Sequence, residues 1–359
     1  MKIMFFIQGM KSGGAERVVS VLCNGLADKG HQVVLGLTET TEDVAYSLHE
    51  KVVVKDVTSK KGNVFRRRLL GIKKMRRLIK EERPDVVISF ITRTNIYAII
   101  AAMGTRVPVI ISERNDPARD PKSRFTKALR NIVYPLCDGC VFQTGYAREY
   151  FGKRLATKSV VIPNPVSGEV VGKGNNERRE KRVVCACRLE PQKNVDMLIE
   201  AFCLAIKEEK EYRLEVYGTG SLKDSLTTKI KELKLEDKVV LKGYEANVIE
   251  IMSQSEIFAL SSDYEGMPNA LIEAMCVGCA CVATDSPAFG AREFIINGEN
   301  GILVRVGDAK AMAEALKRMM SDNDFRRKCG SNAQKVYERV EANTIIDLWI
   351  EYINNICHI

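Results

Sequence analysis

The strongest constraint on the fold is a repeated alternation of short apolar, β-branched runs with longer stretches of helical periodicity. Such runs are typical of buried parallel strands, and the stretches between them of crossover helices. The pattern occurs in two sets, with the polar, Gly-bearing segment 168–182 between them. We therefore expect two consecutive open α/β domains joined by this linker, each with its ligand-binding edge at the carboxyl ends of its strands.

The alternation predicts strands before and after the polar segment. Those before it are Lys2–Gln8, Gln32–Leu37, Val52–Val57, Asp85–Phe90, Val107–Ser112, Gly139–Gln143 and Ser159–Ile162. Those after it are Arg182–Ala186, Tyr212–Tyr217, Lys238–Leu241, Ile257–Leu260, Ala280–Ala283 and Gly301–Val304. The domains are predicted at 1–170 and 171–339. The amphipathic stretch 340–359, around Trp349, predicts a final helix that returns to the first domain.

The composition is that of a soluble globular protein. A length of 359 residues suits two ordinary domains, and 45% hydrophobic and 28% charged residues allow an ample core. No apolar run reaches the roughly 18 residues that a transmembrane helix needs. The apolar start runs into a Gly-rich loop rather than a small-residue cleavage site, so we interpret it as a buried strand and not a signal peptide.

The eleven cysteines lie mostly in apolar segments. Without a signal peptide we expect reduced thiols in a reducing, cytoplasmic compartment. Cys137 and Cys140 form one cluster, and Cys276, Cys279 and Cys281 another. A zinc site is the alternative, but no His is near, and we favour buried structural thiols.

The charge is uneven along the chain. Residues 1–170 carry 29 Lys and Arg against 16 Asp and Glu, and residues 60–80 hold ten basic residues and no acid. Apolar residues recur there at steps of three and four from Phe65 to Ile79, which predicts an amphipathic basic helix. Such a helix either docks on its own sheet or meets an anionic partner, and the charge density favours lipid headgroups or a lipid-linked diphosphate. Nucleic acid is disfavoured, because aromatic residues do not alternate with the basic ones. The basic residues of this candidate surface are Arg66, Arg67, Arg68, Lys73, Lys74, Arg76 and Arg77.

A glycine loop follows the first predicted strand. Gly13 and Gly14 stand just before a predicted helix start near Ala15, which suits a phosphate, because glycine lets a ligand approach the backbone and the helix start offers free N–H groups. The alternative is a plain turn between strand and helix. The loop lacks the G-x-G-x-x-G spacing that is typical of a nicotinamide dinucleotide site.

The second half carries a denser constellation. Arg188 and Lys193 leave the end of one predicted strand, where two cations can neutralise a diphosphate, although they could also be solvated surface cations. The next strand ends in the pair Gly218 and Gly220.

Two carboxylates follow a third strand of this half. Glu265 lies in a loop, and Glu273 lies eight residues later on a predicted helix among apolar neighbours, where a carboxylate is costly without a partner such as a ribose. The segment Gly266, Met267, Pro268, Asn269 and Ala270 at the helix start is a candidate phosphate or sugar site. Its backbone N–H groups, which every residue but Pro268 carries, would donate to the ligand oxygens.

These residues resemble the retaining glycosyltransferase family 4 with its two-domain GT-B fold. The E-x7-E pair Glu265 and Glu273 carries the resemblance best, and Gly13–Arg17 and Ile162–Pro165 are also similar. The resemblance implies that Glu273 holds the ribose, Glu265 contacts the donor sugar, Arg188 and Lys193 grip the diphosphate, Gly14 approaches the phosphates, and Gly243 and Tyr244 lie near the base.

The resemblance also implies that the first domain binds the acceptor, that the second binds the nucleotide sugar across a cleft from it, and that no metal or other cofactor is needed.

One loop departs from the family pattern. Many relatives carry a His that faces the transferred sugar, and here the segment reads Ser112–Asp116, with Arg114 in the place of that His. We keep Glu113 and Arg114 as candidate catalytic residues. The alternative is an ordinary surface loop with an internal ion pair.

The sequence therefore predicts a metal-independent transferase. It would move a hexose or N-acetylhexosamine from a UDP- or GDP-sugar, with retention, to a lipid-linked glycan at the inner face of the cell membrane, as a peripheral protein. The alternatives are a nucleotide-sugar 2-epimerase of the same fold and a non-catalytic module that binds a nucleotide sugar or a membrane.

Overall fold

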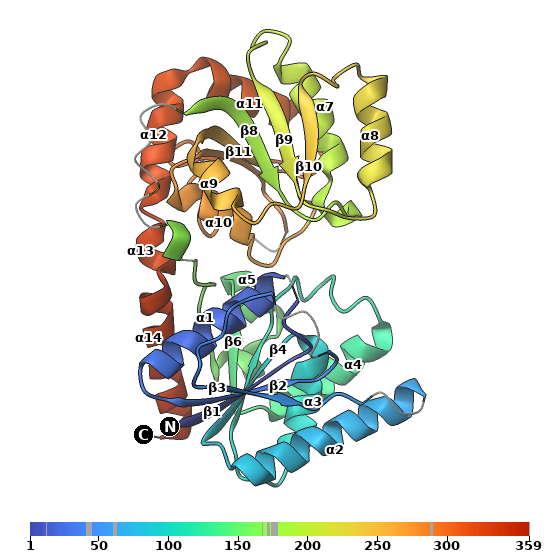
Figure 1. Ribbon diagram of the computed structural model, residues 1–359, viewed down its shortest axis with the longest axis vertical. Helices are drawn as coiled ribbons and strands as arrows, with labels where there is room; N and C mark the ends of the chain where they lie inside the picture. Colours follow the sequence, from blue (N-terminus) through green and yellow to red (C-terminus); the bar gives the residue numbers. More distant parts are fainter. Residues whose placement is uncertain are drawn as a thin grey trace. The chain divides into compact units, whose positions relative to one another are not determined.

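The computed structural model describes residues 1–11, 13–40, 45–59, 63–166, 168–170, 173, 179–287 and 290–358. The chain forms two compact units, Met1–Pro165 with Ala342–Ile359, and Val166–Glu341 (Figure 1). The second unit begins before the expected boundary at residue 170, because Val166 and Val170 are buried in its core. The expected linker also ends early, since a strand begins at Glu180.

The first unit is an all-parallel sheet in the order β3-β2-β1-β4-β5-β6-β7. The direction of strand order reverses between β1 and β4, which is where open α/β sheets form a ligand crevice at their carboxyl edge. Its strands are β1 (Lys2–Ile7), β2 (Gln32–Leu37), β3 (Val52–Asp56), β4 (Val86–Phe90), β5 (Val109–Ser112), β6 (Gly139–Phe142) and β7 (Ser159–Val161).

Helices cover both faces of this sheet because the central strand is apolar on both sides. Ile3, Phe5 and Ile7 pack into one core with α1 and α14, whereas Met4 and Phe6 pack into another with α2 and α3. The helices are α1 (Gly14–Asp28), α2 (Val64–Glu82), α3 (Thr92–Ala102), α4 (Arg124–Val133), η1 (Tyr134–Leu136), α5 (Gly145–Tyr150), α6 (Lys153–Ala156) and α14 (Ala342–Cys357).

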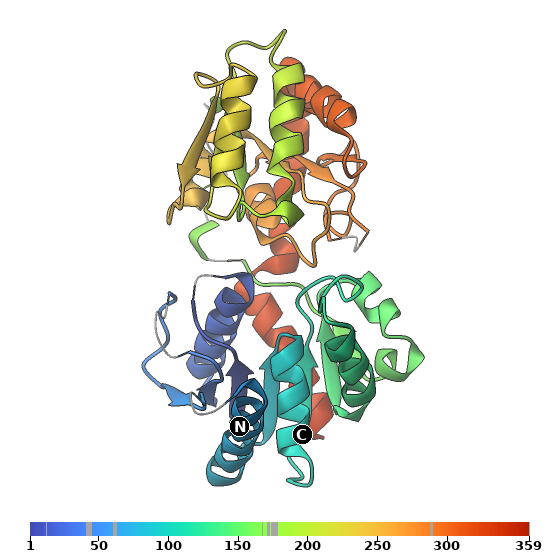
Figure 2. The same cartoon turned by 90° about the vertical axis from the view of Figure 1, so that its right-hand side faces the viewer.

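The C-terminal helix α14 belongs to the first unit, which confirms the expected return (Figures 1 and 2). Trp349 is 1% exposed in the core beside α1. Tyr352 ties the helix to the sheet, since its hydroxyl accepts from the backbone N–H of Cys140 at 2.8 Å and donates to the carbonyl of Lys158 at 2.6 Å. Lys29 and Asp347 add a surface ion pair of 2.7 Å.

The second unit is also an all-parallel sheet, in the order β10-β9-β8-β11-β12-β13. Its order reverses between β8 and β11. Its strands are β8 (Glu180–Ala186), β9 (Arg213–Tyr217), β10 (Val239–Gly243), β11 (Ser255–Leu260), β12 (Ala280–Thr284) and β13 (Ile302–Val304). The helices are η2 (Gly168–Val170), η3 (Pro191–Lys193), α7 (Val195–Ala205), α8 (Lys223–Glu232), α9 (Val248–Ser253), α10 (Asn269–Cys276), α11 (Ala309–Ser321), α12 (Asn323–Gln334) and α13 (Tyr337–Val340).

Every predicted strand is therefore present, with ends that move by a residue or two. The fold class is confirmed as two parallel-sheet α/β units. The two cysteine clusters lie in apolar cores, with Cys137 and Cys140 in the first unit and Cys276, Cys279 and Cys281 in the second. Among the helices that the structure describes, none combines the length and the apolar character that crossing a bilayer requires.

Candidate active site

The loops that follow β8 and β11 meet at the point where the strand order of the second unit reverses. The ammonium group of Lys193 lies 2.5 Å from Oε1 of Glu265, and both side chains are mostly buried. The same oxygen accepts a hydrogen bond of 2.6 Å from the hydroxyl of Ser262. A pair this well shielded from water is held in one geometry, because breaking it would leave a buried charge without compensation.

Further contacts hold the same two loops together. Asn194 donates to the carboxylate of Asp263 at 2.8 Å, and the side-chain amide of Gln192 donates to the carbonyl of Tyr264 at 2.8 Å. The backbone N–H of Asp263 donates to the carbonyl of Gln192 at 2.9 Å. The tertiary structure thus brings together Lys193 and Glu265, which lie far apart in the sequence.

Arg188 leaves the same strand as Lys193 but is exposed, whereas Lys193 is partly buried. The backbone beside Arg188 is packed tightly. A Cβ atom on Gly218 would lie 1.9 Å from the carbonyl oxygen of Cys187, and one on Gly220 would lie 2.3 Å from that of Leu189. The predicted glycine pair therefore serves first to let the loop after β9 pack under the loop that carries Arg188.

Two further residues expected near the nucleotide, Gly243 and Tyr244, lie at the end of β10, the strand beside β9. Gly243 ends β10 with a φ of 79°, and its carbonyl accepts from the N–H of Gly218 at 2.7 Å. Tyr244 follows with 69% of its surface exposed, so its ring is free to meet a ligand. These positions agree with a binding edge, since both follow the carboxyl end of a strand.

Helix α10 begins directly after the Glu265 loop. Its first residue is Asn269, with Pro268 at the N-cap, and its axis directs a positive dipole end toward the segment Gly266–Ala270. Gly290 packs closely against this segment. A Cβ atom on Gly290 would lie 2.2 Å from the carbonyl oxygen of Gly266. Glu273 lies one turn into the helix and is 4% exposed, which places a carboxylate in the core of the unit beside the helix start.

The glycine loop of the first unit follows β1. Helix α1 starts at Gly14, one residue before the expected start, and Gly14 is exposed. The hydroxyl of Tyr46 accepts from the N–H of Gly13 at 3.2 Å and donates to its carbonyl at 3.0 Å. Ser12 lies outside the described residues.

Glu113 departs from its expected role, because its carboxylate faces the protein interior. It is 3% exposed and accepts hydrogen bonds from the hydroxyl of Tyr134 at 2.8 Å and from that of Thr92 at 3.1 Å. Burial raises the pKa of this carboxyl group, while its hydrogen bonds and Arg130 lower it. Glu113 therefore supports the loop from below rather than presenting a group to a ligand.

Arg114 lies at the carboxyl edge of the first sheet. Its guanidinium donates to Oδ1 of Asn164 at 2.5 Å and lies 4.4 Å from the centre of the Phe90 ring. Gln143 donates to the same Asn164 oxygen at 2.7 Å. Burial lowers the pKa of Arg114 to about 9 and the carboxylate of Glu113 raises it, so the side chain stays charged at neutral pH.

The basic helix α2 matches the expected amphipathic pattern over only half its length. Met75 and Ile79 are buried, but Phe65 is 71% exposed and Leu69 is 46% exposed. Docking on the sheet, the alternative interpretation of this helix, thus accounts for its C-terminal half alone. Lys60 and Lys61 lie outside the described residues.

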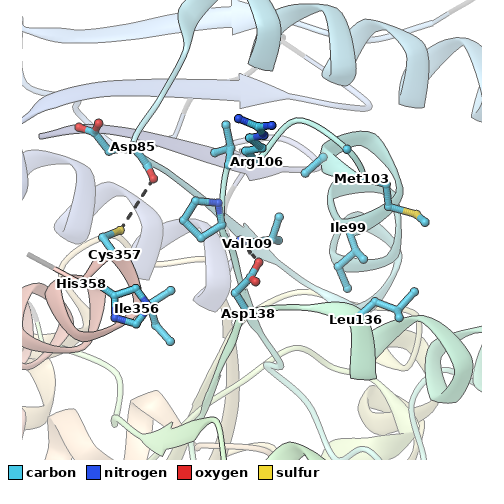
Figure 3. A pocket seen from close by; sticks show the side chains of 14 residues that line it. Asp85, Ile99, Met103, Arg106, Val109, Leu136, Asp138, Ile356, Cys357 and His358 are labelled. Carbon is cyan, nitrogen blue, oxygen red and sulfur yellow. Dashed lines mark hydrogen bonds between the residues drawn. The ribbon is translucent and has the colours of Figure 1, made fainter.

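A cavity of about 520 Å³ lies at the opposite edge of the first sheet, at the amino ends of β4, β5 and β6 (Figure 3). Its two carboxylates accept hydrogen bonds from backbone N–H groups. Asp138 accepts from the N–H of Val109 at 2.8 Å, and Asp85 accepts from that of Lys2 at 2.7 Å. We therefore leave this cavity outside the candidate site.

Sequence reasoning missed several supporting residues. Ser262 stands three residues before Glu265, a spacing that a search for hydroxyls near the acidic pair would find. No sequence pattern predicts the contacts that Asn164 and Trp349 make with Arg114, because these contacts depend on packing between residues far apart in the sequence.

The comparisons with known proteins identify the family of the chain. The family model described as Glycosyltransferase Family 4 matches residues 12–169, and that described as Glycosyl transferases group 1 matches residues 169–336. The Campylobacter jejuni protein named GalNAc-alpha-(1->4)-GalNAc-alpha-(1->3)-diNAcBac-PP-undecaprenol alpha-1,4-N-acetyl-D-galactosaminyltransferase is 30% identical, over 98% of this chain and 98% of its own. A second enzyme of that organism, N-acetylgalactosamine-N,N'-diacetylbacillosaminyl-diphospho-undecaprenol 4-alpha-N-acetylgalactosaminyltransferase, is 29% identical over 95% of this chain and 96% of its own.

Among solved structures, HepE of Anabaena in complex with UDP and glucose superimposes with a TM-score of 0.80 at 22% identity, over 99% of each chain. The two parallel-sheet units are thus those of the GT-B glycosyltransferases. The chain belongs to the group 1 glycosyltransferases of family 4.

Proposed function

We propose that the enzyme moves a hexose or N-acetylhexosamine from a UDP- or GDP-sugar, with retention, to a lipid-linked glycan during glycan or polysaccharide assembly. The observation that carries this proposal is the clamped pair of Lys193 and Glu265 beside the start of α10. Both Campylobacter relatives are named for substrates on undecaprenyl diphosphate, and HepE was solved with UDP and glucose, which supports the class of acceptor and of donor.

The proposed roles of the site residues follow from the charge that develops during transfer. As the bond between the anomeric carbon and the diphosphate oxygen breaks, negative charge grows on the leaving group, and Lys193 and Arg188 would stabilise it together with the N–H groups at the start of α10. Glu265, already oriented by Lys193 and Ser262, would accept hydrogen bonds from the sugar hydroxyls. Glu273 would hold the ribose.

The remaining candidates complete this proposal. Gly14 would approach the phosphates, Gly243 and Tyr244 would lie near the base, and Arg114 would meet the transferred sugar. The leaving-group charge is met by cations and amides, so we propose that no metal takes part.

We also propose a peripheral position at the inner, cytoplasmic face of the cell membrane. The exposed Phe65 and Leu69 stand beside Arg66, Arg67 and Arg68 on α2. Apolar and cationic side chains on one helix suit the interface of an anionic bilayer.

The test measures donor hydrolysis and transfer with Glu273→Ala and Lys193→Ala. Both variants should lose activity, and full activity in both would remove the assignment. Product analysis separates the reaction classes: release of a nucleoside diphosphate supports transfer, a 2-epimer of the donor sugar indicates isomerisation, and donor binding without turnover indicates a binding module.

A further inference from the structure

Three of the cysteines are half-buried, whereas the other eight are buried; the three are Cys187, Cys203 and Cys357. Among the described residues, Cys187 is the one of these three with a second sulfur within hydrogen-bond distance. Its Sγ lies 3.7 Å from that of Cys185, which is 1% exposed near the end of β8. The two thiols therefore form a pair in which solvent reaches one member and the protein encloses the other.

This thiol pair stands beside the candidate active site. Cys187 directly precedes Arg188, and both Lys193 and Glu265 act electrostatically on its thiol. The hydrogen bond with Cys185 has the largest effect and lowers the pKa of the Cys187 thiol. Burial and Glu265 raise this pKa, whereas Lys193 and Arg188 lower it, and the net direction is downward. A half-exposed thiol near cations, with its thiolate favoured, is the environment of a reactive cysteine.

The enclosed member of the pair is suited to a different role. The same hydrogen bond, followed by burial, raises the pKa of the Cys185 thiol. Cys185 therefore keeps its proton and donates it toward Cys187. It is held within a strand, at the distance of a hydrogen bond from the sulfur that would react first. Such a thiol can resolve an oxidised neighbour.

We propose that Cys187 and Cys185 form a modification site that a peroxide oxidises to a disulfide. The Cys187 thiolate attacks one oxygen of hydrogen peroxide, the O–O bond breaks, and the sulfur becomes a sulfenic acid. The departing hydroxide takes up the proton that the thiol had released and leaves as water. The Cys185 sulfur then attacks the Cys187 sulfur, the S–O bond breaks, and the hydroxide leaves with the Cys185 proton as a second water. Two thiols are thus oxidised while one peroxide is reduced.

Closing this bond would shorten the chain after β8. Cα atoms two residues apart in a strand are separated by about 6.6–6.8 Å, at the upper end of the about 4.4–6.8 Å that a disulfide spans. The sulfurs must also approach from 3.7 Å to about 2.05 Å. Because Cys187 lies just beyond the last residue of β8, the movement falls on Cys187 rather than on Cys185.

The backbone around Cys187 has little room for that movement. Its N–H donates to the carbonyl of Tyr217 at 2.9 Å, and the N–H of Leu189 donates to that of Thr219 at 2.9 Å. A Cβ atom on Gly218 would lie 1.9 Å from the carbonyl oxygen of Cys187. A contraction at Cys187 would therefore displace Arg188, which stands between the two hydrogen-bonded residues, together with the loop after β9.

We expect oxidation to weaken binding of the donor nucleotide and a thiol reductant to restore it. This consequence rests on the proposed function, because it needs Arg188 at the donor diphosphate. The thiol chemistry itself does not depend on that function and can be measured without it.

The first experiment detects the bond by mass spectrometry. Trypsin cleaves after Arg182 and Arg188, so the peptide 183–188 carries both cysteines of the pair and no other. The full chain is exposed to hydrogen peroxide, unfolded and alkylated. The peptide should then be lighter by two hydrogens than the thiol form and carry no alkyl group, and dithiothreitol before alkylation should restore two alkylated thiols.

The same digest contains a control. Cys203 lies in the peptide 194–207, is also half-buried, and should keep its alkylated thiol. Two alkylated thiols in the peptide 183–188 after peroxide would overturn the proposal. A sulfinic acid on Cys187 in place of the disulfide would overturn it as well.

Matched variants assign the two sulfurs. Cys185→Ala removes the resolving thiol and should leave a sulfenic acid on Cys187 that dimedone traps. Cys187→Ala should leave Cys185 unmodified, and Cys203→Ala should oxidise as the wild type does. Equal trapping on Cys185 in Cys187→Ala would overturn the assigned roles. Circular dichroism and the melting temperature show which variants fold, and the wild-type peptide decides the proposal where one does not.

The last measurement links the bond to the donor site. Thermal stabilisation by UDP and by GDP is compared before and after peroxide. The oxidised wild type should need about tenfold more nucleotide for the same rise in melting temperature, and dithiothreitol should reverse this change. In Cys187→Ala, peroxide should leave the stabilisation unchanged. An equal loss in Cys187→Ala would show that peroxide acts elsewhere and would contradict the predicted consequence.

The two proposals fail separately. Absence of the disulfide in the peptide 183–188 would sink only this inference. Full activity of Lys193→Ala would sink the proposed function and leave the mass-spectrometric result standing.

Discussion

The indole of Trp349 stacks on the ring of Phe90, with the ring centroids 5.9 Å apart and an interplanar angle of 23°. The guanidinium of Arg114 lies over the same Phe90 ring and 5.9 Å from the Trp349 ring. The last helix of the chain thus supports a candidate catalytic loop of the first unit, although more than two hundred residues separate them.

Truncating this stack should cost both stability and activity. Trp349→Ala removes a large, fully buried side chain and should lower the free energy of unfolding by about 3–5 kcal/mol. Trp349→Phe keeps an aromatic contact with Phe90 and should cost less. Urea unfolding measures both, with Leu348→Ala, at a half-exposed neighbour, as the control. Equal losses for Leu348→Ala and Trp349→Ala would contradict the packing argument.

The ion pair of the second unit should be needed for turnover. Lys193→Ala removes the cation that we propose stabilises the leaving group, and it should lower kcat by about a hundredfold or more. Steady-state transfer assays measure this effect. Lys207→Ala, which removes an exposed lysine elsewhere in the unit, serves as the control and should leave kcat unchanged. Similar rates for the two variants would rule out the assigned role.

The two glycines near Arg188 and the nucleotide edge should differ in their tolerance of a side chain. Gly218 and Gly243 both have positive φ angles, of 135° and 79°, but only at Gly218 would a Cβ atom meet backbone, 1.9 Å from the carbonyl oxygen of Cys187. Gly243→Ala should cost about 1 kcal/mol from the backbone conformation, and Gly218→Ala clearly more. Thermal unfolding compares them, and equal losses would show that the loop yields without cost.

The buried carboxyl group of Glu113 should make stability depend on pH. Its pKa is raised in the folded state, so above the ordinary value of 4.5 the unfolded chain loses the proton first. Wild-type stability should therefore fall, relative to Glu113→Gln, by up to about 1.4 kcal/mol per pH unit from pH 4.5 to the raised pKa, and then level off. Urea unfolding of both proteins from about pH 4 to about pH 8 checks the sign. A difference that stays constant, or that grows in favour of the wild type, would contradict it.

Helix α2 should contribute to membrane binding through its exposed half. Phe65→Ser removes an apolar side chain that is 71% exposed, and Arg66→Ala removes an adjacent charge. Each should weaken partition onto phosphatidylglycerol vesicles, the second by about 1 kcal/mol at low salt. Co-flotation measures this partition. Neutral vesicles should abolish the effect of Arg66→Ala, and undiminished flotation of both variants would remove α2 from the interface.

Local sequence patterns were sufficient for the strands and for the two-domain organisation. The β1 residues Ile3 to Ile7 are apolar at every position, and only a strand buried on both faces requires that. Lys193 and Glu265 could likewise be assigned to one edge of the second sheet, since the carboxyl ends of parallel strands share it, whereas the strand order that makes β8 and β11 neighbours came from the structure.

Only the tertiary structure could decide where each side chain points and what covers it. Glu113 and Arg114 are adjacent in the sequence, yet one faces the core and the other the aromatic ring of Phe90. Phe65 and Met75 belong to one helical stripe, yet Phe65 is exposed whereas Met75 is buried in the core beneath the sheet. Periodicity along the chain determines which residues share a face, whereas the burial of that face depends on segments that are distant in the sequence.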